Sequence, residues 1–257
     1  MKPKSRVESL ENIERIASQY EISLQFVTVK FAGHRIKFAI PNRKCLHFAM
    51  SIEKREPMTN KWILAFKRDD VFFDIGANNG VFALMAAVVP GCRVYAFEPH
   101  FASYYTLVHN VFANDLQERV SAYPLAISDK LSFGNLYLSA ITAGKSLNNF
   151  GDARPSEEEL WNAVIPQAAV SVSIDEFVRN TGVMPNHIKV DVDGIEPLIV
   201  AGARQTLADP RLKSIMIEID ENEASHLAIL ETMQASGFGR YIKDEAGVFF
   251  FRDQEQP

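Results

Sequence analysis

Hydrophobic and polar residues follow two different periodicities along this chain, one helical and one typical of strands. Residues 7–20 repeat apolar side chains at helical spacing, which predicts an amphipathic helix. Residues 23–39 alternate between apolar and polar positions around Ala32-Gly33-His34, which predicts a β-hairpin. Helical pieces are expected after the hairpin, as far as residue 67. The pattern therefore predicts an N-terminal extension over residues 1–68.

From Asp70 onward, short apolar runs alternate with longer helical patterns, which is typical of a parallel sheet with helices on both faces. The expected strands are residues 71–75, 93–97, 120–127, 187–192 and 214–219, closed by an antiparallel pair at 240–244 and 247–252. The expected helices are residues 79–89, 101–114, 196–208 and 223–236. We therefore predict an α/β fold over residues 69–257, with a doubly wound, mostly parallel seven-stranded sheet.

Residues 132–169 interrupt this alternation. They contain short strand-like pieces, three glycines, two prolines and the acidic run Glu157-Glu158-Glu159. Long insertions at the carboxyl ends of strands often carry binding residues. We expect this insertion, together with the extension, to select the substrate.

The segment Asp74-Ile75-Gly76-Ala77-Asn78-Asn79-Gly80 joins the first expected strand to its helix. Gly76 and Gly80 permit a tight turn, and Asn78 is a residue type that tolerates positive φ. A strand that turns into a helix in this way is expected to point backbone N–H groups outward, where a ligand can bind them. The segment therefore predicts a binding site.

Glu98 ends the second expected strand, within Phe97-Glu98-Pro99. An acid about 20 residues beyond such a turn is placed to accept hydrogen bonds from both hydroxyls of a ribose. The alternative is a solvent-exposed acid before Pro99.

The turn does not match the dinucleotide-binding fingerprint, because Asn78 and Val81 stand where that pattern requires glycine. A nicotinamide-dependent oxidoreductase is therefore only a competing hypothesis. Asp74 favours a ligand with an ammonium group and no pyrophosphate, and S-adenosylmethionine fits this description. Alternatively, Asp74 only stabilises the helix N-terminus through the helix dipole.

The segment from His187 to Glu196 is a strand with an unusual charge pattern. Its apolar residues share one face, whereas Lys189, Asp191 and Asp193 share the other. Buried parallel strands are normally apolar on both faces, so charges there are costly unless they are paired or functional. Ligands of doubly wound sheets bind at the carboxyl ends of the strands, which places Asp191, Asp193 and Glu196 at a predicted active site.

Two other interpretations of these charges remain open. Lys189 and Asp191 could form an ion pair while Asp193 caps the following helix. Alternatively, Asp191, Asp193 and Glu218 could bind Mg²⁺ or Ca²⁺, because these cations prefer carboxylate oxygens. We predict no metal.

Several motifs resemble those of the FkbM family of S-adenosylmethionine-dependent methyltransferases. They occur in one order along the chain: D-I-G-A-N-N-G at 74–80, A-F-E-P at 96–99, A-I-S-D at 126–129, S-I-D-E-F at 173–177 and K-V-D-V-D-G-I-E at 189–196. The resemblance covers roughly residues 55 to 220. It implies a Rossmann-like class I fold and O-methylation of a sugar, glycan or polyketide-like hydroxyl.

The resemblance also implies roles for individual residues. Cofactor contacts are expected at Asp74, Gly76, Ala77, Asn78, Asn79, Gly80, Glu98, Pro99, Phe101, Ser128 and Asp129. Asp129 is expected near the adenine, unless it is only a turn residue. Phe101 either packs on the adenine or belongs to the core. The candidates for the catalytic base are Asp191, Glu196, Asp193 and, less directly, Lys189.

Alternatives to O-methylation remain at this point. The acceptor atom could be nitrogen or a carboxylate oxygen, and a cofactor-binding module without turnover is also compatible with the motifs. We expect a small-molecule or glycan acceptor, and the sequence does not predict an oligomeric state.

Composition narrows the setting of the protein. The chain has 257 residues, a net charge of −5 and a pI of about 5.7, which argues against binding duplex nucleic acid. Its two cysteines, Cys45 and Cys92, lack metal-ligand spacing. The longest apolar run, residues 81–89, is too short to span a bilayer, and no signal-peptide pattern is present. We therefore expect a cytoplasmic protein without a membrane span.

Overall fold

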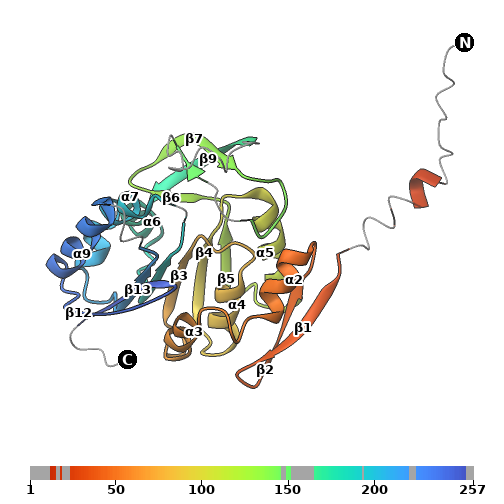
Figure 1. The fold of residues 1–257 in the computed structure, drawn as a ribbon, viewed down its shortest axis with the longest axis horizontal. Coiled ribbons are helices and arrows are strands. Elements are labelled where there is room, and N and C mark those ends of the chain that lie inside the picture. Colours follow the sequence, from red (N-terminus) through yellow and green to blue (C-terminus); the bar gives the residue numbers. More distant parts are fainter. Residues whose placement is uncertain are drawn as a thin grey trace, which may run out of the picture.

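The computed structural model of the protein describes residues 12–15, 18, 24–145, 149–151, 165–192, 194–219 and 224–252. These residues form a large central sheet, a smaller four-stranded sheet and a separate β-hairpin (Figure 1). Most of the predicted helix at 7–20 lies outside the described residues.

The central sheet has the seven strands that the sequence predicts. In spatial order they are β12 (Arg240–Asp244), β13 (Gly247–Phe251), β11 (Ser214–Ile217), β10 (His187–Val190), β3 (Val71–Ile75), β4 (Arg93–Phe97) and β5 (Val120–Tyr123). Only β13 runs antiparallel to the other strands. The predicted α/β fold is therefore confirmed.

The order of the strands places a switch point between β3 and β10. From β3 the chain builds outward through β4 to β5, and it later returns to place β10 on the other side of β3. Crossover connections diverge at this position, so their loops leave a crevice at the carboxyl ends of the two strands. In the register of this pair, Lys189 lies beside Asp74.

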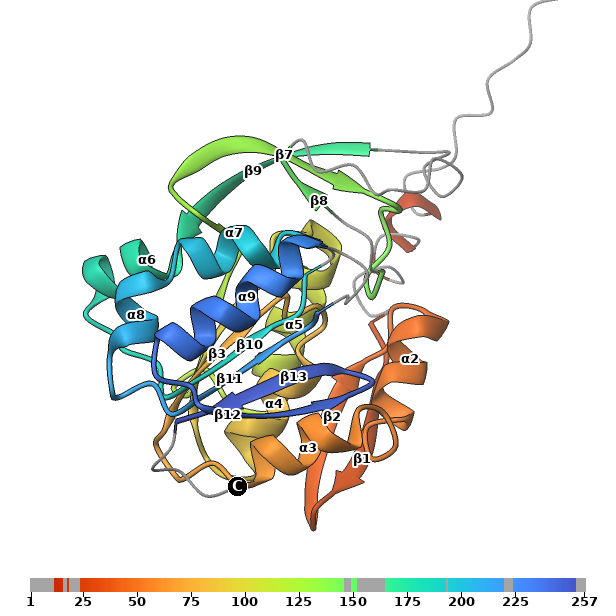
Figure 2. The same cartoon turned by 60° about the vertical axis from the view of Figure 1, so that its left-hand side comes forward.

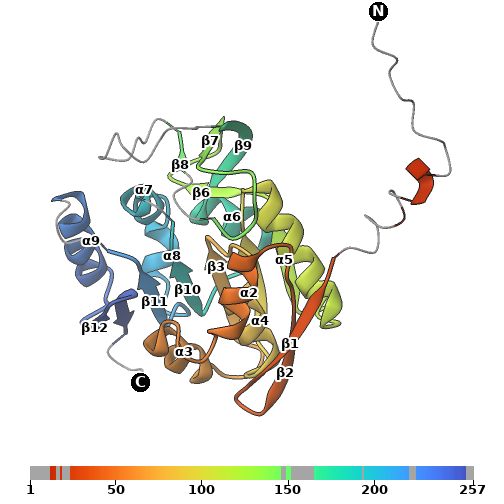
Figure 3. The same ribbon diagram turned by 45° about the vertical axis from the view of Figure 1, so that its right-hand side comes forward.

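Helices cover both faces of the sheet, in two layers that Figure 2 and Figure 3 show from different sides. One layer contains α3 (Pro57–Leu64), α4 (Val81–Val88) and α5 (Phe101–Ala113). The other contains α6 (Ile174–Thr181), α7 (Glu196–Ala201), α8 (Arg204–Ala208) and α9 (Ala224–Ala235). Because strand residues alternate in direction, Phe72 belongs to the first core and Phe73 to the second.

The prediction of one strand over residues 120–127 is wrong in extent, because this segment forms two strands that belong to different sheets. Pro124 separates β5 from β6 (Ala126–Ser128), and proline cannot donate a hydrogen bond to a sheet. The strand β6 pairs with β9 (Ile165–Ser173) in the small sheet, which also contains β7 (Ser132–Leu138) and β8 (Asn149–Phe150). The predicted insertion therefore supplies most of a sheet that lies over the carboxyl ends of β4 and β5 (Figure 1).

The predicted helix at 196–208 is also wrong in extent, because it breaks between α7 and α8. Gly202 lies at the break, where a Cβ atom would come within 2.5 Å of the Ser128 carbonyl oxygen. The helix α6 is absent from the predicted helices, although Ser173 and Glu176 form a capping box at its start.

Residues 26–50 of the N-terminal extension pack against the first helical layer. Its hairpin consists of β1 (Phe26–Phe31) and β2 (His34–Ala39), and α2 (Arg43–Met50) follows. The side chain of Asn110 in α5 accepts a hydrogen bond from the Ala39 backbone N–H at 2.6 Å. The hairpin and the core are therefore connected at a buried position.

Candidate active site

The turn after β3 has the backbone conformation that its residue types allow. Gly76, Asn78 and Gly80 have φ angles of 79°, 51° and 83°. A Cβ atom on Gly76 would lie only 1.9 Å from the backbone oxygen of Asp191, so no other residue fits there without displacing the chain. The turn after β3 and the end of β10 are thus in direct contact.

Most N–H groups of this turn donate hydrogen bonds within the protein. Gly76 and Ala77 both donate to the Phe97 carbonyl oxygen, at 3.0 and 3.1 Å, and Gly80 donates to Ala77. The Asn78 N–H donates to the Glu98 carboxylate at 2.8 Å. This differs from the expectation of outward N–H groups, and it leaves the turn with few donors for a charged ligand.

Glu98 braces the turn from the end of β4. Its second carboxylate oxygen accepts a hydrogen bond from the His100 N–H at 2.7 Å, and only 7% of the residue is exposed. A carboxylate oxygen has more than one lone pair, so the oxygens of a residue such as Glu98 can each accept more than one hydrogen bond. Glu98 and Pro99 both line the cavity beside the turn.

The segment that follows β7 lies against the same turn. The ring of His100 contacts the Ala140 carbonyl oxygen at 3.2 Å and the Ser103 hydroxyl at 3.0 Å. The Gly144 N–H also donates to the Ser103 hydroxyl, at 3.2 Å. These contacts hold residues 140–145 beside the cavity, where Lys145 is one of the lining residues.

A buried cluster of charges lies where β3 and β10 end. The Lys189 side chain is 1% exposed and forms an ion pair with Asp191, whose side chain is 34% exposed. The Lys189 ammonium also lies 4.9 Å from the centre of the Phe82 ring. Asp74, beside Lys189 in the sheet, is 1% exposed.

Lys189 and Asp191 keep each other ionised. Burial disfavours the ammonium of Lys189, but the charges of Asp191, Glu56 and Asp74 outweigh burial and raise its pKa. Burial likewise opposes ionisation of Asp191, but the Lys189 charge and a hydrogen bond from Glu218 lower the pKa of Asp191. Asp191 is therefore a carboxylate at neutral pH.

Glu218 follows β11 at the rim of this cluster. Loss of hydration, the Asp191 charge and a hydrogen bond to Asp191 raise the pKa of Glu218 to about 8. At neutral pH Glu218 thus carries the proton that it shares with Asp191, although the residue as a whole remains exposed.

Asp74 behaves in the opposite way to Asp191. Burial outweighs the attraction of Lys189 and raises the pKa of Asp74 to about 6. Both carboxylate oxygens are buried, and Asp74 is outside the lining of the cavity. This burial gives no support to the predicted contact between Asp74 and the cofactor. Asp74 instead lies beside Lys189 in the sheet and interacts with its charge.

Replacing Asp74 by Asn should change how stability depends on pH. An acid whose pKa rises on folding contributes most stability below its unfolded pKa, near 4, and loses that contribution as pH rises through about 6. Relative to wild type, Asp74→Asn should therefore gain up to about 3 kcal/mol of unfolding free energy between pH 4 and pH 7.5. Urea denaturation at both pH values measures this difference. Asp69→Asn, at a half-exposed position, is the control and should show no such gain.

The cavity brings together most of the predicted turn residues with part of the charged strand. It is lined by Gly76, Ala77, Asn78, Asn79, Glu98, Pro99, Lys189 and Asp191, together with Phe48, Arg55, Val81, Phe82, Leu136, Lys145 and Val192. Phe48 and Arg55 from the extension and Leu136 and Lys145 from the insertion were not predicted as site residues. The one signal in the sequence for Arg55 was that the resemblance to the FkbM family begins near residue 55.

Other predicted residues lie apart from this cavity. Ser128 is 5% exposed at the end of β6, and Asp129 beside it forms an ion pair with Lys130 at 3.7 Å. Phe101 is 50% exposed at the start of α5, so it is not a core residue. None of these lines the cavity, and the predicted contacts of Ser128, Asp129 and Phe101 with the cofactor stay predictions.

Of the other two predicted catalytic carboxylates, the structure describes Glu196 but not Asp193. Glu196 is 2% exposed at the start of α7, where it accepts a hydrogen bond from the Gly194 N–H at 3.3 Å. Asp193 lies outside the described residues. Within the described part of the chain, no three Asp, Glu, His or Cys side chains form a group that could hold a metal ion.

The fold is that of a class I S-adenosylmethionine-dependent methyltransferase. A crystal structure of methyltransferase FkbM from Methylobacillus flagellatus KT superposes with a TM-score of 0.51 at 16% identity, over 78% of this chain and 47% of that one. This chain thus spans about half the length of that protein. None of the described helices is long and apolar enough to cross a bilayer.

Sequence comparison identifies the family. A family model for the methyltransferase FkbM domain matches residues 74–239, which is well over half of the chain. A relative from Streptomyces tacrolimicus, 31-O-demethyl-FK506 methyltransferase FkbM, is 23% identical over 66% of this chain and 72% of its own length. The chain belongs to the FkbM methyltransferase family, which confirms the resemblance found in its motifs and sets aside the oxidoreductase hypothesis.

Proposed function

We propose that this methyltransferase acts on a hydroxyl oxygen of a small-molecule or glycan acceptor, with Asp191 as the catalytic base. The observation that carries the proposal is the position of Asp191. Its ionised carboxylate lines the cavity at the carboxyl end of β10, in backbone contact with the turn at Gly76. A carboxylate within hydrogen-bond reach of a hydroxyl can take its proton as the oxygen reacts.

The residues beside the turn fit S-adenosylmethionine. Glu98 offers carboxylate oxygens to ribose hydroxyls, whereas Pro99 and Leu136 offer apolar surface to a planar base. Ala77, Asn78 and Asn79 line the same cavity as Glu98 and Asp191. We assign the cofactor to this cavity, with its ribose at Glu98 and its reactive end toward Asp191.

The chain's own groups then have separate tasks. The cofactor supplies an electrophilic methyl group when bound. Asp191 receives the proton of the acceptor hydroxyl, and the buried ammonium of Lys189 fixes the orientation of the Asp191 carboxylate. Holding the acceptor oxygen in line with the methyl group supplies much of the rate acceleration. Lys189 is therefore a positioning residue in this proposal.

The choice of a hydroxyl acceptor draws on the relative described above. That relative is a methyltransferase of 31-O-demethyl-FK506, a name that places the methyl group on an oxygen. In this chain, we assign acceptor selection to the extension (residues 1–68) and the insertion (residues 132–169), because both supply residues to the cavity wall. An amine or carboxylate acceptor is the alternative that product analysis separates.

One series of measurements tests this function. Calorimetry should detect micromolar binding of S-adenosylmethionine and S-adenosylhomocysteine, and no binding of NAD. A methyl-transfer assay with hydroxyl, amine and carboxylate acceptors, followed by mass spectrometry, should find the methyl group on oxygen of a hydroxylated compound. Products methylated only on nitrogen or on a carboxylate would overturn the assignment of the acceptor.

Removing the Glu98 carboxylate should weaken cofactor binding. We expect Glu98→Ala to cost about 1–3 kcal/mol in binding free energy, because charge-assisted hydrogen bonds to the ribose are lost. Calorimetric titration with S-adenosylhomocysteine measures the change. Glu118→Ala, at an exposed site before β5, is the matched control. An unchanged dissociation constant for Glu98→Ala would exclude Glu98 from the site.

A further inference from the structure

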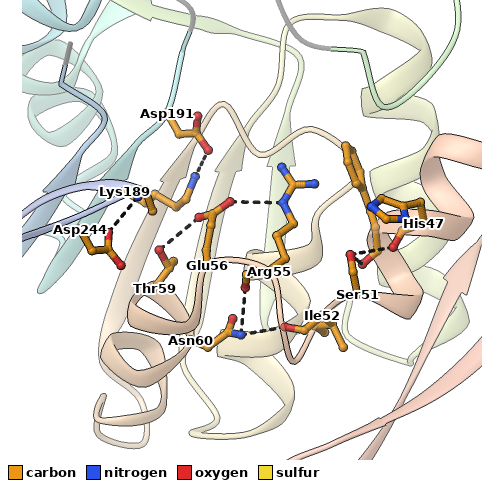
Figure 4. Close-up of polar contacts among 12 residues, drawn as sticks. His47, Ser51, Ile52, Arg55, Glu56, Thr59, Asn60, Lys189, Asp191 and Asp244 are labelled. Carbon is orange, nitrogen blue, oxygen red and sulfur yellow. Dashed lines mark hydrogen bonds and ion pairs between the residues drawn. The ribbon is translucent and has the colours of Figure 1, made fainter.

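Arg55 occupies a corner of the extension that is built with an unusual backbone. The next residue, Glu56, has φ 47° and ψ 64°, in the left-handed region, and Pro57 then begins α3. A non-glycine residue in this region is strained and persists where the surrounding structure holds it. The corner turns both Arg55 and Glu56 toward the end of β10 (Figure 4).

Several contacts hold this corner in place. The side chain of Asn60 donates to the carbonyl oxygens of Ile52, at 2.7 Å, and Arg55, at 3.1 Å. The Thr59 hydroxyl donates to the Glu56 carboxylate at 3.1 Å. Figure 4 shows the Glu56 carboxylate between the Lys189 ammonium and the Arg55 guanidinium. The backbone around Arg55 is therefore fixed from two sides.

Contacts orient the Arg55 side chain but use only part of its hydrogen-bonding capacity. Its Nε donates to the Glu56 carboxylate at 3.3 Å, and its guanidinium lies 4.0 Å from the centre of the Phe48 ring. Within the described part of the chain, hydrogen bonds of the guanidinium involve only Nε. The side chain is 38% exposed and lines the cavity, so its terminal N–H groups are available to a ligand.

The other cationic side chains in the lining of this cavity are Lys145, beside Asn78, and Lys189. The turn after β3 uses the N–H groups of Gly76, Ala77, Asn78 and Gly80 within the protein. Lys189 is engaged with Asp191. The planar guanidinium of Arg55 matches the geometry of a carboxylate, to which it can donate two parallel hydrogen bonds.

We infer that Arg55 binds the carboxylate at the amino-acid end of the cofactor. The inference rests on the proposed cofactor site, in which the ribose lies at Glu98 and the chain of the cofactor passes Gly76 toward Asp191. Arg55 stands at that far end, because it lines the same cavity as Asp191, and its partner Glu56 lies between it and the Lys189 that pairs with Asp191 (Figure 4). The N-terminal extension, outside the matched family domain, thereby completes the cofactor site.

The test compares two ligands that differ in one group, S-adenosylmethionine and decarboxylated S-adenosylmethionine. We expect Arg55→Gln to weaken binding of the first by about 10- to 100-fold and to leave the second within about twofold. Arg55→Lys should recover part of the affinity, because a lysine keeps the charge but not the planar fork. Calorimetry gives both dissociation constants without requiring turnover.

The control variant is Arg68→Gln, at a side chain that is 76% exposed and outside the cavity, which should change neither constant. Equal weakening of both ligands by Arg55→Gln would make Arg55 a structural residue and overturn the inference. Unchanged binding of both, with a raised KM only for acceptors that carry a carboxylate, would also overturn it and assign Arg55 to the acceptor. If wild type binds neither ligand, the proposed function itself fails, and the inference fails with it.

Discussion

Asp191→Asn should bind the cofactor as wild type does and turn over hundreds of times more slowly. The substitution keeps the shape of the side chain but removes the group that accepts the hydroxyl proton. General-base catalysis contributes about 10²- to 10⁴-fold, so kcat should fall by that factor while the dissociation constant of S-adenosylhomocysteine changes by less than about twofold. Single-turnover kinetics and calorimetry measure the two quantities separately.

A neighbouring variant controls for disturbance of the charge cluster. Glu218→Gln keeps a hydrogen-bond donor beside Asp191, since its amide can replace the proton that Glu218 carries below about pH 8. We expect this variant to retain most of the activity. Full activity in Asp191→Asn would remove Asp191 from the mechanism and leave Glu196 and Asp193 as the remaining carboxylate candidates.

Lys189→Met should be among the most destabilising single substitutions in the sheet. The ammonium is 1% exposed, and it faces the carboxylates of Asp191, Asp74 and Glu56. Removing one partner from a buried ion pair typically costs about 3–5 kcal/mol, because the remaining charges are left without compensation. Urea denaturation at pH 7.5 should show a loss of this size.

The cost of Lys189→Met should also depend on pH in a defined direction. The pKa of Asp191 is lowered in the folded wild type, so the stability from its ionised form is lost only as pH falls below about 4. Without Lys189, the nearby carboxylates take up protons at higher pH, which relieves their repulsion. The cost should therefore be smaller at pH 5 than at pH 7.5. Lys130→Met, which breaks an exposed pair with Asp129, should cost at most about 1 kcal/mol and is the control. A cost that is equal at both pH values would contradict the proposed role of the ammonium.

The sequence was sufficient to predict the elements whose causes are local. The turn at residues 74–80 requires glycines at fixed spacing, and the structure gives Gly76 and Gly80 the positive φ angles that only glycine adopts freely. Apolar runs likewise predicted the seven strands of the central sheet, because burial on both faces leaves little room for polar residues. The charged face of Lys189 and Asp191 stood out for the same reason.

Features that depend on tertiary contact were not predictable in this way. The chain leaves the central sheet at Pro124, yet the destination of β6 depends on its pairing with β9, about 40 residues later. The role of Arg55 in the cavity depends on a left-handed Glu56 and on contacts with Thr59 and Asn60. No regular spacing of residues in the sequence predicts contacts of this kind. The burial of Asp74 beneath Lys189 follows from strand register, which the sequence pattern did not specify.

The contact between Gly76 and the backbone of Asp191 makes two parts of the enzyme mechanically inseparable. The backbone at Gly76, in the wall of the proposed cofactor site, touches the backbone of Asp191, the proposed base, so neither can shift without displacing the other. Their alignment is set by backbone geometry and not by the choice of a side chain. In the proposed site, the surrounding loops can therefore change to fit other acceptors while this backbone contact keeps Gly76 and Asp191 aligned.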